Sequence, residues 1–360
     1  MLTPQLKTDL EYTFSKLSDE ELKKLKGSKI LITGGAGFLG FYMMHFLHRY
    51  YKELELERVI CLDNFMLGTP KWLDEMPFTV RKFDIIHDNI ADIEEAEDID
   101  YIIHMASIAS PMFYRQYPLE TLDANVWGLR KLFDFYKDKD IKGILFFSSS
   151  EIYGNPANDA VPTNEEYHGD VSCTGPRACY DEAKRFGETM CRIFALSYNM
   201  PIGVARPFNN YGPGMKINDK RVPADFAKNV VDGNNITILS SGSPSRTFCY
   251  IADAVAGYFK VLLHGRYDYF NIGIQEPEIS VLQLAEIYKA KGETVFGYMG
   301  EIEYAVSEDK DYLTNNPQRR CPDISKAQNV LGYAPSITVE QGVERFLRFI
   351  KESSEENLIW

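Results

Sequence analysis

The sequence lacks the features of a membrane protein, a secreted protein or a zinc-binding protein. No stretch approaches the roughly 18 consecutive apolar residues of a membrane-spanning helix, and the charged N-terminal segment has no apolar signal-peptide core. The six cysteines are scattered singly, without C-x-x-C pairs or the histidine spacing of a zinc site. These absences predict a cytoplasmic protein with reduced thiols, no membrane attachment and no bound metal.

Basic residues are in the minority. The 360-residue chain carries 52 acidic and 39 basic side chains, which gives a formal net charge of −13 at pH 7. A field of this sign repels nucleic acids and anionic lipids, so the composition argues against both as partners. An anionic substrate would need arginines gathered where it binds.

What the sequence does contain is an alternation of short apolar runs and helix-like stretches. The runs KILITGG, RVICLDN, DYIIHMAS and GILFFSSS start at positions 29, 58, 100 and 143. They have the composition of buried parallel strands. Because a helix-like stretch follows each run, the pattern predicts an α/β fold built on a doubly wound, Rossmann-type parallel sheet.

The first chemical motif is rich in glycine and joins a strand to a helix. In TGGAGFLG (33–40), Gly34, Gly37 and Gly40 follow an apolar run and precede the helical run FYMMHFLHRYY. This context lets the backbone approach a pyrophosphate, which then sits on the helix N-terminus. Asp63 ends the next strand, where a carboxylate can bind an adenosine ribose and repel the 2′-phosphate of NADP. The motif therefore predicts NAD as the cofactor.

A second motif places a tyrosine and a lysine on one helical face. Tyr180 and Lys184 lie four residues apart, and Ser149 lies upstream in the strand end FFSSSEIYG. An adjacent ammonium favours a phenolate, so we expect Lys184 to lower the pKa of Tyr180 from its usual value of about 10. Tyr180 would then act as a general base for an alcohol proton, and Ser149 would orient the hydroxyl that is oxidised.

Together these motifs resemble the extended short-chain dehydrogenase/reductase superfamily that acts on nucleotide sugars. The segments HMASIASPMFY (104–114), GPRACYDEAKR (175–185), SRTFCYIAD (245–253) and NPQRRCPDISKA (316–327) are most similar to its UDP-glucuronate decarboxylase (UDP-xylose synthase) branch. The resemblance implies an NAD-dependent enzyme that converts UDP-glucuronate to UDP-xylose through a 4-keto intermediate. It also implies a homodimer packed through the helix that carries Tyr180 and the helix before it.

The resemblance assigns roles to individual residues. The catalytic positions are matched by Ser149, Glu151, Tyr180 and Lys184, with Glu151 near sugar C5. The NAD contacts are matched by Gly34, Gly37, Phe38, Gly40, Asp63, Asn64, Asp84, Tyr180 and Lys184. The substrate contacts are matched by Tyr114, Asn209, Arg221, Arg246 and Arg319. The arginines among them would supply the positive charge that an anionic nucleotide sugar requires.

Other functions fit parts of the pattern. A nucleotide-sugar 4-epimerase shares the oxidation at C4, but Glu151 and the segment GPRACYDE argue against it. A 4,6-dehydratase usually carries Asp-Glu where this chain has Ser150 and Glu151, and a decarboxylase has no departing hydroxyl for that aspartate to protonate. A catalytically idle NAD-binding sensor or scaffold is disfavoured by the intact set of Ser149, Tyr180 and Lys184.

The same reading predicts how the chain is divided. Helical spacing of apolar residues and a Ser18/Glu21 pair that resembles a capping box predict a helical N-terminal extension. The predicted units are the extension at 1–26, an NAD-binding domain at 27–205 that also includes 246–275, a smaller interleaved substrate-binding domain at 206–245 and 276–350, and a tail at 351–360.

Overall fold

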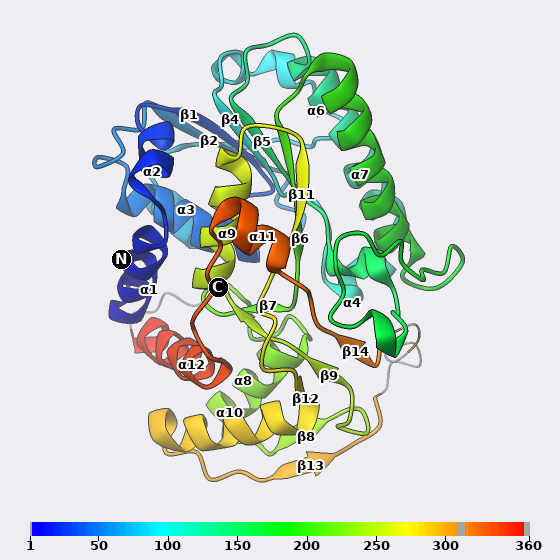
Figure 1. Cartoon of the computed structure of the whole chain (residues 1–360). Helices are drawn as coiled ribbons and strands as arrows, with labels where there is room; N and C mark the ends of the chain where they lie inside the picture. The colour runs from blue at the N-terminus through cyan, green and yellow to red at the C-terminus, as the bar shows by residue number, and fades with distance from the viewer. Residues whose placement is uncertain (1, 308–313, 315, 356–360) are drawn as a thin grey trace.

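The computed structural model, which describes residues 2–307, 314 and 316–355, has a parallel sheet of seven strands at the centre of its larger lobe (Figure 1). In spatial order the strands are β11 (Asp268–Ile272), β6 (Ile202–Pro207), β5 (Gly143–Phe147), β4 (Tyr101–His104), β1 (Lys29–Thr33), β2 (Arg58–Asp63) and β3 (Thr79–Lys82). The four runs predicted as strands are β1, β2, β4 and β5. The doubly wound parallel sheet is confirmed.

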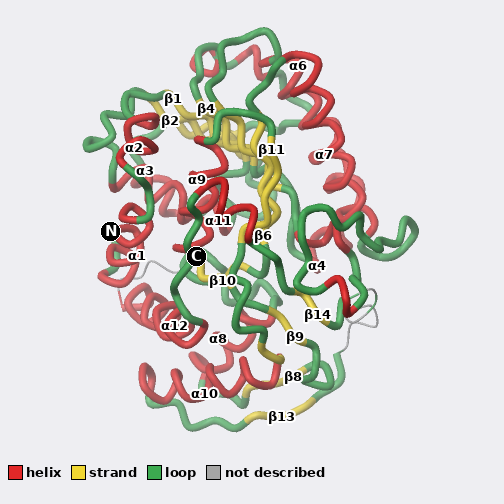
Figure 2. The backbone as a smooth tube through the Cα atoms, viewed as in Figure 1, coloured by secondary structure: helices red, strands yellow, loops and turns green. Residues whose placement is uncertain are grey.

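Helices cover both faces of this sheet (Figure 2). One face carries α3 (Phe38–Arg49) and α9 (Ile251–Leu263), and the other carries α6 (Leu129–Tyr136) and α7 (Ala178–Tyr198). Successive strand residues point to opposite faces, so in β1 Ile30 and Ile32 pack with α3 and α9 while Leu31 packs with α6 and α7. This two-sided burial explains why the strands are continuous apolar runs.

The chain reverses its winding direction between β1 and β4. Strands β2 and β3 lie on one side of β1, and β4, β5, β6 and β11 lie on the other. In such sheets the crossover helices diverge at this point and leave a crevice at the carboxyl ends of the strands. The fold therefore places ligands beyond residues 33 and 104.

A smaller lobe closes over these strand ends. Its strands are β7 (Asn210–Tyr211), β8 (Ile236–Ile238), β9 (Ser245–Arg246), β10 (Cys249–Tyr250), β12 (Ile279–Ser280), β13 (Ile302–Tyr304) and β14 (Arg319–Arg320). Its helices are α8 (Val222–Asp232), α10 (Val281–Phe296) and α12 (Val339–Glu355). Helix α11 (Ser325–Leu331) falls in the stretch expected for the substrate-binding unit, but it packs on β11 and α9 of the larger lobe. The tail expected at 351–360 continues α12 to residue 355, and 356–360 lie outside the described residues.

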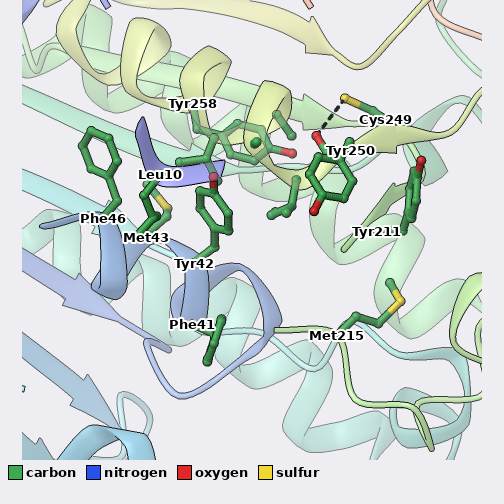
Figure 3. Packing of buried hydrophobic residues seen from close by; sticks show 14 of the residues in the cluster. Leu10, Phe41, Tyr42, Met43, Phe46, Tyr211, Met215, Cys249, Tyr250 and Tyr258 are labelled. Atoms are coloured by element: carbon green, nitrogen blue, oxygen red, sulfur yellow. Dashed lines mark hydrogen bonds between the residues drawn. The ribbon is translucent and has the colours of Figure 1, made fainter. Parts of the chain in front are cut away.

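The predicted N-terminal extension consists of α1 (Pro4–Ser15) and α2 (Asp19–Leu25). The capping box of Ser18 and Glu21 is present at the start of α2. Leu10 of α1 packs beside Tyr42 and Met43 of α3 (Figure 3). The extension is thus part of the main hydrophobic core.

The segment between β4 and β5 is also helical. It contains α4 (Pro111–Gln116), α5 (Pro118–Asp123) and a π-helical turn (Ala124–Gly128) that leads into α6. Within the described residues, no helix combines the length and apolar character that crossing a membrane requires.

Candidate active site

A cavity of about 1350 Å³ opens at the carboxyl ends of the sheet strands. Its walls come from the ends of β1, β2, β4, β5 and β6 and from the smaller lobe. It is lined by every residue to which the sequence assigned a catalytic, NAD-binding or substrate-binding role, except Arg319. Segments far apart in the chain thus meet in one space.

The glycine-rich turn between β1 and α3 forms one wall. Gly34 has φ +73°, and a Cβ atom there would lie 2.6 Å from the Ala106 backbone, so a larger residue cannot occupy it. Helix α3 starts directly after Gly37, its N-cap residue, which makes no side-chain capping bond. The first amide groups of α3 therefore remain available for an anion, and the turn fits the pyrophosphate of a dinucleotide.

Acidic and amide side chains follow β2 and β3 on the same wall. The Asp63 carboxylate accepts hydrogen bonds from the Ala36 and Phe65 amides at 2.9 and 2.8 Å, and burial raises its pKa. Asn64 and Asp84 also line the cavity, where each accepts a bond from a backbone amide two residues ahead. This arrangement holds Asp63 rigidly at the strand end, in the position expected for a ribose ligand.

Ser149, Tyr180 and Lys184 come together where β5 ends beside α7. The Ser149 hydroxyl lies next to Tyr180, whose phenolate it favours, and accepts a bond from the Glu151 amide at 3.2 Å. Lys184 donates to the Phe147 carbonyl at 2.8 Å, and its ammonium lies 5.6 Å from the Tyr180 ring centroid. The three side chains face one region of the cavity.

The expected effect of Lys184 on Tyr180 is wrong for the ligand-free protein. Burial raises the pKa of Tyr180 to about 12 and lowers the pKa of Lys184 to about 7. The Lys184 ammonium donates to a carbonyl, and desolvation disfavours its charged form. Its effect on the pKa of Tyr180 is therefore smaller than the effect of burying the phenol. A lower pKa for Tyr180 requires additional positive charge in the cavity.

A cluster of opposite charges lies beside this group. Glu151 forms ion pairs with Arg177 and with Arg320, whose second nitrogen lies 2.5 Å from the carboxylate. Burial alone would raise the pKa of Glu151, but the two guanidinium groups prevail and lower it to about 2. Asp181 lies 3.5 Å from Arg177, and burial together with the Glu151 charge raises the pKa of Asp181 to about 7. Glu151 is therefore ionised at neutral pH.

The other expected substrate residues take distinct positions. Tyr114 stacks on Tyr180 with ring centroids 5.2 Å apart, and its hydroxyl has no hydrogen-bond partner among the described residues. Arg246 binds the Ser245, Gln318 and Pro317 carbonyls. Asn209 donates to the Thr247 carbonyl at 2.8 Å, and Arg221 pairs with Asp219.

Arg319 and Arg320 are neighbours in β14 and point in opposite directions. Arg319 pairs with Glu278, with its Nη2 at 2.6 Å, and stays outside the cavity wall. Arg320 faces Glu151 instead. Arg115, Arg177 and Arg320 also line the cavity and were missed by sequence reasoning. Arg177 lies three residues before Tyr180, so its place near the site could have been inferred from the sequence. Which of the two residues of the short strand β14 faces the cavity could not.

Residues 30–273 match the model of the NAD dependent epimerase/dehydratase family. The chain belongs to this family. Membership confirms the superfamily resemblance and the dependence on NAD that the glycine-rich motif predicts.

Curated members of the epimerase/dehydratase family resemble the chain over most of its length. It is 34% identical over 343 residues to UDP-glucuronic acid decarboxylase 1 of Xenopus tropicalis, a match that covers 94% of this chain and 75% of that protein. It is 33% identical over 319 residues to UDP-glucuronic acid decarboxylase 6 of Arabidopsis thaliana, which covers 88% of this chain and 86% of the relative.

Solved structures of epimerases share the fold. UDP-glucose 4-epimerase of Thermotoga maritima has a TM-score of 0.78 at 24% identity, over 91% of this chain and 99% of that one. An epimerase of Methanothermobacter thermautotrophicus has a TM-score of 0.77 at 26% identity, over 94% and 96% of the two chains. The architecture of sheet and smaller lobe is therefore common to the family.

Proposed function

We propose that the protein is an NAD-dependent nucleotide-sugar decarboxylase that converts UDP-glucuronate to UDP-xylose. The observation that carries this proposal is the group of three arginines, Arg177, Arg246 and Arg320, near two carboxylates, Glu151 and Asp181, beside Tyr180. A uronic acid carries a carboxylate on C5. This carbon is next to C4, whose hydroxyl Tyr180 would deprotonate. The surplus of guanidinium groups supports binding of that carboxylate, which a neutral hexose lacks.

We propose that the two lobes bind different ligands. We assign NAD binding to the wall formed by residues 27–205 with 246–275, which contains the glycine-rich turn, Asp63 and Asp84. We assign substrate binding to 206–245 and 276–350, which supply Asn209, Arg221 and Arg320. Arg246 also binds on this side, because β9 pairs with β12 and β14 of the smaller lobe although Arg246 falls in the segment 246–275. When bound, NAD supplies a hydride acceptor for C4 and a positive charge that favours the Tyr180 phenolate.

Tyr180 and Ser149 handle the proton at C4. Tyr180, as the phenolate, takes the proton of the C4 hydroxyl, and the Ser149 hydroxyl orients that oxygen. The interaction of the Ser149 hydroxyl with Tyr180, which favours the phenolate, supports their acting on the same substrate atom. Lys184 is buried next to them and adds positive charge near the phenolate in its protonated form.

Once C4 is a ketone, the C5 carboxylate is β to a carbonyl. Carbon dioxide can then leave, and the electron pair of the broken bond moves to the C4 oxygen. Ser149 and Tyr180, now protonated, donate hydrogen bonds to this oxygen. Glu151, ionised between Arg177 and Arg320, keeps both guanidinium groups beside the departing carboxylate.

The decisive test is the mass of the product. The purified protein with NAD is incubated with UDP-glucuronate, UDP-glucose and UDP-galacturonate, and the nucleotide sugars are analysed by mass spectrometry. We expect loss of carbon dioxide from UDP-glucuronate and a UDP-pentose product. Formation of an isomer without loss of mass would identify a 4-epimerase instead, and no turnover of any sugar would leave an NAD-binding protein without activity.

We also propose a homodimer packed through α7 and the helical segment before it. Apolar side chains are exposed on this surface, including Phe186 at 51% and Leu196 at 68% on α7, with Leu119 and Trp127 on the preceding segment. A second copy would cover them.

A cytoplasmic location is supported by the cysteines, all six of which lie in the described residues as free thiols.

A further inference from the structure

The end of the cavity in the smaller lobe has mainly apolar walls. Helices α8 and α10 and the segment after β8 surround it, in the lower part of Figure 1. Its lining residues are Val222, Pro223, Asp225, Leu239, Ser240 and Val281. Asp225 is the acidic side chain in this group, and the charge of Lys220, which also lines the cavity, acts on it.

Helix α8 begins beside the wall to which NAD is assigned and runs away from it, so residues further along α8 lie further from the cofactor. Arg221, the N-cap residue, stacks over Phe38 at the start of α3, with its guanidinium carbon 5.2 Å from the ring centroid. Asp225 lies four residues further on, so it shares a helical face with Arg221 and sits about 6 Å further along the axis. Arg221 stands at the boundary of the two lobes and Asp225 stands beyond it.

Asp225 has neither a hydrogen bond nor an ion pair within the described part of the chain. Arg221 pairs with Asp219 and so is not its partner. Burial raises the pKa of Asp225 to about 6, which still leaves it ionised at neutral pH. A half-buried carboxylate of this kind is a strong acceptor that lacks a donor.

The charge of the substrate restricts what Asp225 can contact. Diphosphate and uronate groups would be repelled by a carboxylate, so the acceptor suits a donor of the nucleoside, and the apolar walls favour the base N–H over the ribose hydroxyls. A pyrimidine ring with flat apolar walls around it and a ring N–H on its edge matches this end of the cavity. We propose that Asp225 selects the nucleobase by accepting a hydrogen bond from the N3–H of uracil.

This assignment rests on the proposed function because it takes the ligand to be a nucleotide sugar. It adds a reason for preferring uridine nucleotides: cytosine presents a lone pair at N3, which an ionised Asp225 would repel. A hydrogen bond to a charged group typically contributes about 10- to 100-fold in affinity. We therefore expect UDP to bind more tightly than CDP by about this factor.

The test compares ligands that differ at one position. Calorimetry with the NAD-loaded protein measures the binding of UDP, CDP and N3-methyl-UDP, in which a methyl group replaces the N–H hydrogen. The wild-type protein should bind UDP about 10- to 100-fold more tightly than either analogue. In Asp225→Ala the three affinities should agree within about threefold, because the acceptor is gone and the space for the methyl group is open.

The matched control is Asp232→Ala at the other end of α8. Asp232 pairs with Lys228 in solvent, so its removal should leave the ratios of the wild-type protein unchanged. Equal binding of UDP and N3-methyl-UDP by the wild-type protein would overturn the role of Asp225. So would ratios in Asp225→Ala that equal those of the wild type. Failure of all three nucleotides to bind would instead remove the proposed function itself. The ligand comparison in the wild-type protein needs no variant to fold.

Discussion

Glu151 shows how neighbouring charges decide the role of a residue. Its pKa of about 2 makes it an acceptor at neutral pH, so in the ligand-free protein it positions Arg177 and Arg320 rather than donating a proton. The sequence could indicate Glu151 and Tyr180 because both sit in extended motifs. It could not indicate Arg320 over Arg319, because two adjacent residues of a short strand point to opposite faces and only the fold sets which one faces inward.

Replacement of Glu151 by glutamine should separate oxidation from decarboxylation. The change keeps the shape but removes the charge that holds Arg177 and Arg320. We expect pentose formation to fall by about 10²- to 10⁴-fold, equivalent to roughly 3 to 5 kcal/mol of barrier. Stalling after oxidation should appear as accumulated NADH absorbance. A decrease of less than tenfold would contradict the role of Glu151 and favour an epimerase.

Tyr180→Phe tests the general base. The ring that stacks on Tyr114 remains, so the fold and NAD binding should be kept. Turnover should fall by about 10²- to 10⁴-fold, because the substitution removes the group that takes the C4 proton. The measurements are the turnover rate and the NAD content of the denatured protein. Turnover above a tenth of the wild-type value would mean that the motif of Tyr180 and Lys184 is structural.

Among the elements, α1 departs most from the alternation of strand and helix. Asp9 is fully buried in it, where it accepts hydrogen bonds from Tyr250 at 2.5 Å and from Arg345 at 2.9 Å. The helical spacing of its leucines predicted the helix, but an acidic residue in that pattern gave no sign of burial. Its partners lie more than 200 positions away, so only the tertiary fold identifies them.

The buried Asp9 predicts a specific pH dependence of stability. Burial raises its pKa from 3.8 to about 6, so the folded state binds the proton more tightly than the unfolded chain. This contribution to the free energy of unfolding is complete below pH 3.8 and is lost as the pH rises through about 6. Relative to Asp9→Asn, the wild-type protein should gain about 2 kcal/mol between pH 7 and pH 4.5.

Urea unfolding of both proteins at several pH values measures this gain. Glu11→Gln, on the exposed side of the same helix, is the control and should give a curve parallel to that of the wild type. Parallel curves for Asp9→Asn and the wild type would show that Asp9 does not carry the expected proton.

At the scale of the whole molecule, α7 and the segment before it expose apolar side chains that nothing in a single chain covers. The sequence pointed to this surface only through the family resemblance, which implies a dimer packed there. The helical periodicity of α7 buries one face against β6 and leaves Phe186, Ile193 and Leu196 exposed on another. Only the structure separates these two apolar faces.

A charge in the centre of this surface should break the dimer. Ile193→Glu would place a carboxylate in the covered interface, whereas Val330→Glu on α11 changes an exposed apolar residue away from it. Light scattering at micromolar concentration should give twice the chain mass of 41.2 kDa for the wild type and for Val330→Glu, and the single mass for Ile193→Glu. A wild-type protein with the single mass would contradict the proposed assembly.

The contacts of α1 also bear on the order in which the protein can mature on the ribosome. Asp9 meets its partners on residues 250 and 345, and the Gln5 amide meets Glu352 at 2.8 Å. An emerging chain can make the bond to Tyr250 only after 250 of its 360 residues have been translated, and the bonds to Arg345 and Glu352 only after almost all of them, because the partners do not exist before then. Until then α1 can pack Leu10 only against Tyr42 and Met43 of α3, and the Asp9 carboxylate remains hydrated. Although α1 is translated before the sheet, its docking is therefore completed late.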